Sequence, residues 1–141
     1  MRDDNCIFCK LANGVFPTNK LYEDDDFTVI LDASPANKGH ALIIPKQHYA
    51  NLFEIDDEVS SKVLPLAKRI AAAVKEETNS DGINIVQNNG TAAGQTVFHF
   101  HVHVIPRYDS DDFNIGWPQG EPDNNEQTAL AERLSKKLSI D

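Results

Sequence analysis

Basic residues are scarce in this sequence. Its 141 residues include 13 Lys and Arg against 22 Asp and Glu, which gives a formal net charge of −9 and an isoelectric point near 4.9. A protein that covers a stretch of nucleic acid needs a basic face to neutralise the phosphates. We therefore expect no nucleic-acid partner, although local dipoles can still hold a single nucleotide.

Long hydrophobic runs are also missing. No apolar stretch approaches the roughly 20 residues that a membrane-spanning helix requires, so we expect no membrane association. Residues 1–5 lack the basic region and the following apolar region of a secretory signal, which makes a cytoplasmic protein the default expectation. Internal repeats and low-complexity segments are absent, and the length suits one domain, residues 1–141, with a full hydrophobic core.

Cysteine is limited to Cys6 and Cys9, which form a CxxC pair. A redox CxxC normally opens a helix after a strand, and no strand fits into the five preceding residues. Two thiolates at this spacing form half of a zinc site and need two further ligands. The alternative is a pair of free cysteines on a short helix.

Hydrophobic patterning predicts several strands and one long helix. Apolar residues recur at intervals of three or four over residues 56–78, which indicates an amphipathic helix packed on a sheet. These residues are Val59, Val63, Leu66, Ile70 and Val74. Pro65 removes a backbone donor, so we expect a kink early in this helix. Strands are expected over residues 21–23, 27–31, 40–45 and 83–87. A short helix is expected from Ile7 to a C-cap at Asn13-Gly14, and a closing helix over 128–138.

The most distinctive stretch spans residues 95–106, where three of the five histidines stand at alternate positions. Successive side chains of a β-strand point to opposite faces. A strand here would line His99, His101 and His103 along one face and bury the apolar residues on the other. The apolar residues are Phe98, Phe100, Val102 and Val104. Because proline cannot donate to a ladder, we expect the strand to end at Pro106.

Three interpretations of this histidine row stay open on the residues alone. It is a polar strand face, a metal site in which neighbouring histidines share an ion, or a catalytic site with an imidazole nucleophile. The preceding segment, residues 88–96, is rich in glycine and matches neither a P-loop nor a dinucleotide motif. Its backbone N–H groups, with the Gln95 amide and the Thr96 hydroxyl, suit phosphate oxygens. An anion cradle beside a nucleophile suggests phosphoryl or nucleotidyl transfer.

Histidines that alternate with hydrophobic residues are the signature of the histidine triad family, which this sequence resembles in the stretch Gln95-x-Val97-x-His99-Phe-His101-Val-His103. Similar stretches are Asp32-x-x-Pro35-x-x-x-Gly39-His40-x-Leu-Ile-Ile-Pro45-Lys46-x-His48 and Asn88-x-Gly90. The resemblance covers roughly residues 6–108 and leaves a variable tail, residues 109–141. It implies an α+β fold, with a mostly antiparallel sheet of about five strands and one long helix packed on it. It also implies a homodimer.

The resemblance implies a structural zinc ion as well. Zinc-bearing members of the family use a CxxC pair, the histidine that follows Ile-Pro-Lys and the first histidine of the triad. In this sequence these ligands are Cys6, Cys9, His48 and His99.

The remaining histidines are then assigned to catalysis by the same resemblance. His101 is expected to attack the α-phosphorus of a purine nucleotide conjugate, either a phosphoramidate or a dinucleoside polyphosphate, and to form a nucleotidyl-histidine that water hydrolyses. His103 and His40 are expected to assist it. The residues expected to hold the nucleotide are Phe8, Asp32, Asn88, Gly94, Gln95 and Thr96. The protein is thus interpreted as a hydrolase. Two alternatives are a nucleotide-binding regulatory module with little turnover and a module that binds metal with the whole histidine row.

Overall fold

The computed structural model describes residues 1–139. The chain separates into two compact units, the first spanning Met1–Asp111 and the second beginning at Asp112, and each is described by itself. The predicted tail reaches residue 141, so its last two residues lie outside the described ones.

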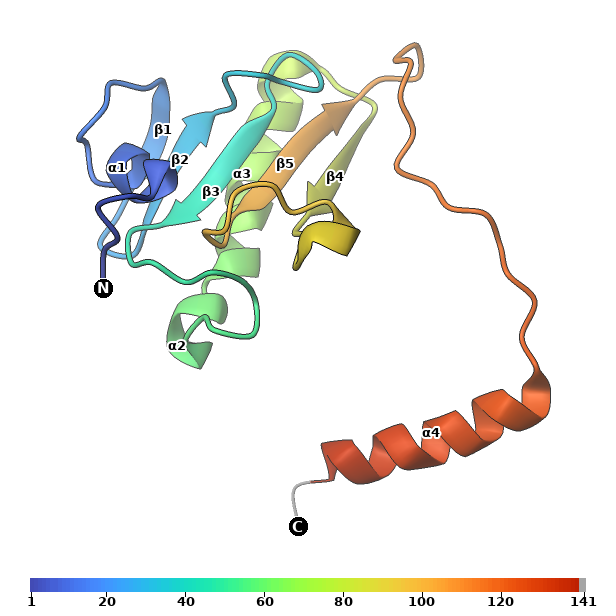
Figure 1. Ribbon diagram of the computed structural model, residues 1–141. Helices are drawn as coiled ribbons and strands as arrows, with labels where there is room; N and C mark the ends of the chain where they lie inside the picture. Colours follow the sequence, from blue (N-terminus) through green and yellow to red (C-terminus); the bar gives the residue numbers. More distant parts are fainter. Residues whose placement is uncertain (140–141) are drawn as a thin grey trace. The chain divides into compact units, whose positions relative to one another are not determined.

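The first unit is built on one antiparallel sheet of five strands (Figure 1). The strands are β1 (Lys20–Glu23), β2 (Phe27–Leu31), β3 (Ala41–Pro45), β4 (Gly82–Val86) and β5 (Val102–Arg107), and they lie in the order β1-β2-β3-β5-β4. Every neighbouring pair is antiparallel. The α+β prediction is therefore confirmed.

Helix α3 (Val63–Thr78) packs on one face of the sheet and runs behind it in Figure 1. Its buried residues are Leu66, Ala67, Ile70 and Val74, which continue the apolar stripe read from the sequence. They share one core with alternate residues of three strands: Phe27, Val29, Ala41, Ile43, Val102 and Val104. These side chains form the larger core of the unit.

The single helix predicted over residues 56–78 is wrong, because the chain forms two helices there. Helix α2 (Asp57–Ser60) ends before α3 begins at Val63. In an unbroken helix Pro65 would leave the carbonyl of Ser61 without its donor, and its ring would clash with that carbonyl. The break instead places Pro65 in the first turn of α3, where backbone N–H groups have no partner within the helix.

The opposite face of the sheet carries helix α1 (Ile7–Ala12). Phe8 and Leu11 of this helix pack against a smaller cluster formed by Ala12, Ile30, Leu42 and Ile44. Helix α1 contacts β2 and β3, so part of the same sheet face remains uncovered beside β5. His103 of β5 lies on that part, and His101 and His99 precede it in the chain.

The predicted histidine strand begins later than expected, since β5 starts at Val102. The residues before it form an irregular segment that bonds to a loop instead of a strand: the Phe100 N–H donates to the Tyr49 carbonyl at 2.6 Å. Phe98, expected in the core, is 52% exposed. Phe100, Val102 and Val104 are buried as expected.

The strand also continues past Pro106, contrary to the prediction. Pro106 pairs with Ile83 of β4, whereas the pairing with β3 ends at Val104. The Pro106 carbonyl accepts a bond from the Asn37 side chain at 2.9 Å, on the side away from β4. Because the N and C=O of one strand residue point the same way, the missing N–H also lies away from the β4 ladder.

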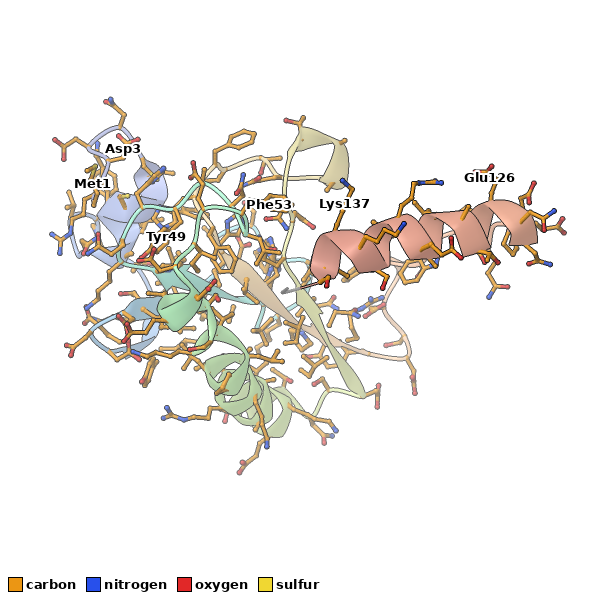
Figure 2. All side chains as sticks on the ribbon, turned by 90° about the horizontal axis from the view of Figure 1, so that it is seen from below. Met1, Asp3, Tyr49, Phe53, Glu126 and Lys137 are labelled. Carbon is orange, nitrogen blue, oxygen red and sulfur yellow. The ribbon has the colours of Figure 1, made fainter. Side chains whose placement is uncertain are left out.

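The second unit contains helix α4 (Asn124–Leu138), which is longer than the predicted 128–138. The Asp123 carboxylate caps it by accepting from the N–H groups of Asn125 and Glu126. Figure 2 shows its side chains, with Glu126 near its start and Lys137 near its end. None of its residues is buried. Across residues 1–139, no helix combines the length and the apolar character needed to cross a bilayer.

Candidate nucleotide site and metal cluster

A pocket of about 710 Å³ lies on the α1 face of the sheet. Five of the six residues predicted to hold a nucleotide line it: Phe8, Asp32, Asn88, Gly94 and Thr96. Two of the three predicted catalytic histidines, His101 and His103, line it as well. Residues from five separate parts of the sequence therefore meet at one concave surface.

His101 is held by a backbone group. Its Nδ1 lies 2.6 Å from the carbonyl oxygen of His99, and a carbonyl can only accept. The hydrogen of the neutral ring is therefore on Nδ1, which leaves Nε2 with a free lone pair. Burial lowers the pKa of His101, so the ring is neutral at cellular pH. These are the properties that a nitrogen nucleophile requires.

His40 and His103 form a bonded pair. The Ala36 N–H donates to His40 Nδ1 at 3.0 Å, so the hydrogen of neutral His40 is on Nε2. That Nε2 lies 2.9 Å from His103 Nδ1, which must then accept. His103 consequently carries its own hydrogen on Nε2. The His101 and His103 rings stand edge to face with centroids 5.0 Å apart. The two neighbouring rings therefore present opposite functions, a lone pair on His101 and a donor on His103.

The same pair is kept neutral by its surroundings. Burial, with His101 and His40 close by, lowers the pKa of His103 to about 4. Burial also lowers the pKa of His40, opposed by the Asp32 carboxylate. An Asp32 oxygen lies 3.5 Å from His40 Nε2, while its other oxygen accepts from the Ser34 N–H at 2.8 Å. Asp32 thus stabilises the turn that leads to Ser34 and also lies beside His40.

The glycine-rich segment supplies the rim of the pocket. Gly90 and Gly94 have φ angles of 90° and 93° and flank a short 3₁₀ turn, Thr91–Ala93. Only glycine adopts this backbone without strain. The Gln95 side chain is buried and does not line the pocket. Its oxygen accepts from the Gly90 N–H at 2.8 Å, and its nitrogen donates to the Ala50 carbonyl at 2.7 Å. Gln95 therefore stabilises the backbone of the rim from the side that faces away from the pocket.

The four predicted zinc ligands converge beside this site. Their ligand atoms, on Cys6, Cys9, His48 and His99, all lie within 4.8 Å of one another. His99 Nδ1 is 3.3 Å from Cys6 Sγ and 3.4 Å from Cys9 Sγ, and His48 Nδ1 is 3.4 Å from Cys9 Sγ. Figure 2 shows Met1 and Asp3 in the N-terminal segment beside α1. The Asp3 N–H donates to Cys9 Sγ at 3.3 Å.

The cluster fits a tetrahedral zinc ion. Bonds of about 2.3 Å to sulfur and 2.0–2.1 Å to nitrogen would separate a sulfur from a nitrogen ligand by about 3.6 Å, close to the observed spacings. The His99 Nε2–H donates to the Pro45 carbonyl at 2.9 Å, which directs the Nδ1 lone pair at the cluster. Burial lowers the pKa of His99 to about 4, and a metal-binding imidazole must be neutral.

The sequence did not reveal all the residues around the pocket. Its further lining residues include Asn19, Ile30, Ser34, Leu42 and Val97. Ile30 and Leu42 alternate with core residues on their strands, so the period of two was the signal that could have placed them on the α1 face. The backbone N–H of Ala36, which sets the tautomer of His40, has no signal in the sequence.

A five-stranded antiparallel sheet that carries a Cys/His cluster and three adjoining imidazoles beside a pocket defines a histidine triad protein. A model of the HIT domain matches residues 13–110. The chain belongs to the HIT domain family, which confirms the resemblance found in the sequence.

Relatives and solved structures agree with this assignment. The chain is 40% identical over 135 residues to adenosine 5'-monophosphoramidase hnt1 of Schizosaccharomyces pombe, covering 95% of this chain and 98% of the relative. Protein SMU.412c of Streptococcus mutans superposes with a TM-score of 0.92 at 43% identity, covering 97% and 87% of the two chains. A zinc-bound histidine triad protein of Mycobacterium smegmatis superposes with a TM-score of 0.74 at 38% identity, covering 94% and 97%.

Proposed function

We propose that this protein hydrolyses purine nucleotide conjugates at the α-phosphate through a covalent intermediate on His101. The observation that carries the proposal is a pair of tautomers, fixed on His101 by the His99 carbonyl and on His103 by the His40 ring. His101 Nε2 offers a lone pair, and His103 Nε2 offers a hydrogen, on rings 5.0 Å apart at the pocket. The similarity to an adenosine 5'-monophosphoramidase supports adenosine phosphoramidate as a substrate.

The pocket offers a distinct role to each part of a nucleotide. Phe8, Ile30 and Leu42 form an apolar wall suited to a purine. Asp32 has a carboxylate suited to the ribose hydroxyls. Asn88, Thr96 and the backbone around Gly94 offer donors to the phosphate. Gln95, which does not line the pocket, holds that backbone in place through its side-chain hydrogen bonds.

The first step transfers the nucleotidyl group to the enzyme. His101 Nε2 attacks the α-phosphorus, and the bond from phosphorus to the leaving amine breaks. The leaving nitrogen takes up a proton from solvent as the bond to phosphorus breaks, and the His103 Nε2–H donates a hydrogen bond to the departing amine. The phosphorylated His101 ring carries a positive charge, which the His99 carbonyl stabilises at Nδ1.

The second step releases the nucleoside monophosphate. Water attacks phosphorus as the bond to His101 Nε2 breaks, and the proton that the water loses passes to solvent. The enzyme then returns to its starting protonation state. Splitting one displacement into two is the general advantage of a covalent nucleophile.

The Cys6, Cys9, His48 and His99 cluster is proposed to hold a structural zinc ion. Such an ion supplies folding energy by fixing its ligands and takes no part in the displacement. The zinc-bound relative and the spacing of the four ligand atoms support this assignment.

A homodimer is proposed from the β4 edge of the sheet. An edge strand presents unpaired N–H and C=O groups, which a second copy can satisfy. Beside it lies an apolar hollow between β4 and α3, with Leu64 69% exposed and Ile85 42% exposed. Covering this surface with the same surface of another chain would remove both features from water.

Incubation with adenosine phosphoramidate and with a dinucleoside polyphosphate tests the activity directly. We expect release of AMP, and rapid acid-free quenching should trap a nucleotidyl adduct on the peptide that contains His101. His101→Ala should lower kcat by several orders of magnitude. Phe98→Ala is the matched control, because this exposed side chain lies three residues away and does not line the pocket. Turnover by His101→Ala at the wild-type rate would refute the assignment of the nucleophile, and AMP binding without turnover in the wild type would favour a regulatory module.

A further inference from the structure

The metal cluster and the nucleotide pocket share helix α1. Cys6 and Cys9 bracket Phe8, whose side chain lines the pocket. The Phe8 ring meets the His101 ring edge to face, with centroids 4.8 Å apart and planes at 86°. The segment that carries two metal ligands therefore also carries one wall of the pocket and a contact to the nucleophile.

His99 provides a second connection. Its imidazole Nδ1 lies within 3.4 Å of both cysteine sulfurs, and its backbone carbonyl holds the Nδ1–H of His101. A shift of His99 toward or away from the cluster would therefore move the group that fixes the tautomer of His101. One residue faces the metal with its side chain and the nucleophile with its backbone.

Helix α1 is attached more strongly at its C-terminal end than at its N-terminal end. At the C-terminal end, the Asn13 side chain donates to the Lys46 carbonyl at 3.0 Å, and the Thr28 hydroxyl donates to the Ala12 carbonyl at 2.7 Å. At the N-terminal end, Cys6 and Cys9 contact His99 and His48, which lie outside the strands, and the His48 N–H donates to the Met1 carbonyl at 2.6 Å. Sulfur hydrogen bonds are weak, so a metal ion bound by both thiolates is the stronger attachment there.

We propose that Phe8 and His99 are positioning residues through which metal binding and nucleotide binding reinforce each other. This inference rests on the proposed function, both for the pocket and for the zinc ion. With the ligands joined by zinc, Phe8 is held against the base and against His101, and the His99 carbonyl is held at His101 Nδ1. Without the ion, the N-terminal end of α1 loses its main attachment, and both contacts loosen. By linkage, AMP must then raise the affinity for zinc by the same factor by which zinc raises the affinity for AMP.

The expected size of this coupling follows from the ring contact. An aromatic pair at this geometry changes an equilibrium by roughly 2- to 12-fold. Removing zinc from the wild type with a chelator should therefore weaken AMP binding, measured by calorimetry, by roughly 2- to 12-fold. In the zinc-loaded protein the ¹⁵N spectrum of His101 should show one tautomer, protonated at Nδ1, and the depleted protein should show a mixture.

Three variants separate this coupling from a general loss of structure. Phe8→Ala should bind zinc in full and bind AMP more weakly, and AMP should raise its zinc affinity less than it does in the wild type, because only the connection through His99 remains. His48→Ala removes a metal ligand that neither lines the pocket nor contacts His101, and it should reproduce the effect of zinc removal. Ile7→Ala changes a neighbouring side chain that is 52% exposed and should behave as the wild type.

The reciprocal measurement also covers the case in which zinc-free protein unfolds. A competing chelator titrated against zinc-loaded protein, with and without saturating AMP, gives the zinc affinity in each state, and the same titration of Phe8→Ala separates the coupling from any contribution of unfolding. Equal zinc affinity with and without AMP would overturn this inference while the observed AMP binding left the proposed function standing. Failure of the zinc-loaded wild type to bind AMP at all would overturn the proposed function and this inference together.

Discussion

Burial of His103 predicts a specific loss of stability in mild acid. An imidazole in the unfolded chain has a pKa of about 6.5, whereas burial lowers the pKa of folded His103 to about 4. The folded state therefore binds the proton less readily than the unfolded state, so the contribution to stability is complete above pH 6.5 and is lost as the pH falls towards 4. At pH 5 the difference corresponds to about 1–2 kcal/mol, after allowance for partial exposure to solvent.

The assay is urea unfolding at pH 7 and pH 5 for the wild type and for His103→Asn. Asparagine keeps an acceptor for the His40 Nε2–H but does not titrate. Other groups, including the proposed metal ligands, also titrate in this range, so the informative quantity is the difference between the two proteins. We expect the wild type to lose about 1–2 kcal/mol more than the variant between the two pH values. Equal losses, with equal m-values, would show that folded His103 protonates as easily as a free imidazole.

Three further predictions address the metal, the assembly and the core. Protein purified without chelator should contain about one zinc ion per chain by elemental analysis, and Cys9→Ser should lose it; a folded wild type without metal would contradict the zinc assignment. Light scattering should give about twice the chain mass of 15.7 kDa, and Ile85→Lys should give the monomer mass, whereas a wild-type monomer at every concentration would refute the β4 interface. Ile43→Ala should lower the free energy of unfolding by about 2–5 kcal/mol because Ile43 is fully buried, and Leu31→Ala, at a position 36% exposed, should lower it by less; similar losses would contradict the core assignment.

The sequence predicted best those helices and strands whose buried face follows directly from the spacing of their apolar side chains. The stripe that ends with Leu66, Ile70 and Val74 identified the packed face of α3, because a period near 3.6 leaves one choice of face. The apolar run of residues 41–45 identified β3 as a central strand, since every residue of it is buried. The helix break was missed because Pro65 fits the first turn of a helix as well as it kinks the middle of one.

The histidine strand was misjudged for a different reason. Alternation from Phe98 to Val104 is compatible with a strand, but a strand also needs a neighbour to receive its backbone bonds. Residues before Val102 have a loop beside them instead, and the Phe100 N–H bonds to Tyr49. The side-chain pattern therefore predicted which histidines gather at the site, while the backbone pairing decided where the strand begins.

The pattern of side chains could not show that the three histidines differ from one another. His99, His101 and His103 are chemically identical and equally spaced, so the sequence alone gives no reason to assign them different roles. The structure distinguishes them by what each ring is bonded to: the Pro45 carbonyl for His99, the His99 carbonyl for His101, and the His40 ring for His103. A carbonyl forces the hydrogen onto the nitrogen facing it, and an N–H donor forces it onto the opposite nitrogen. Each proposed role, as metal ligand, nucleophile or donor, therefore depends on one hydrogen bond at the far side of the ring, and a substitution that changes that bond should alter the role without touching the histidine itself.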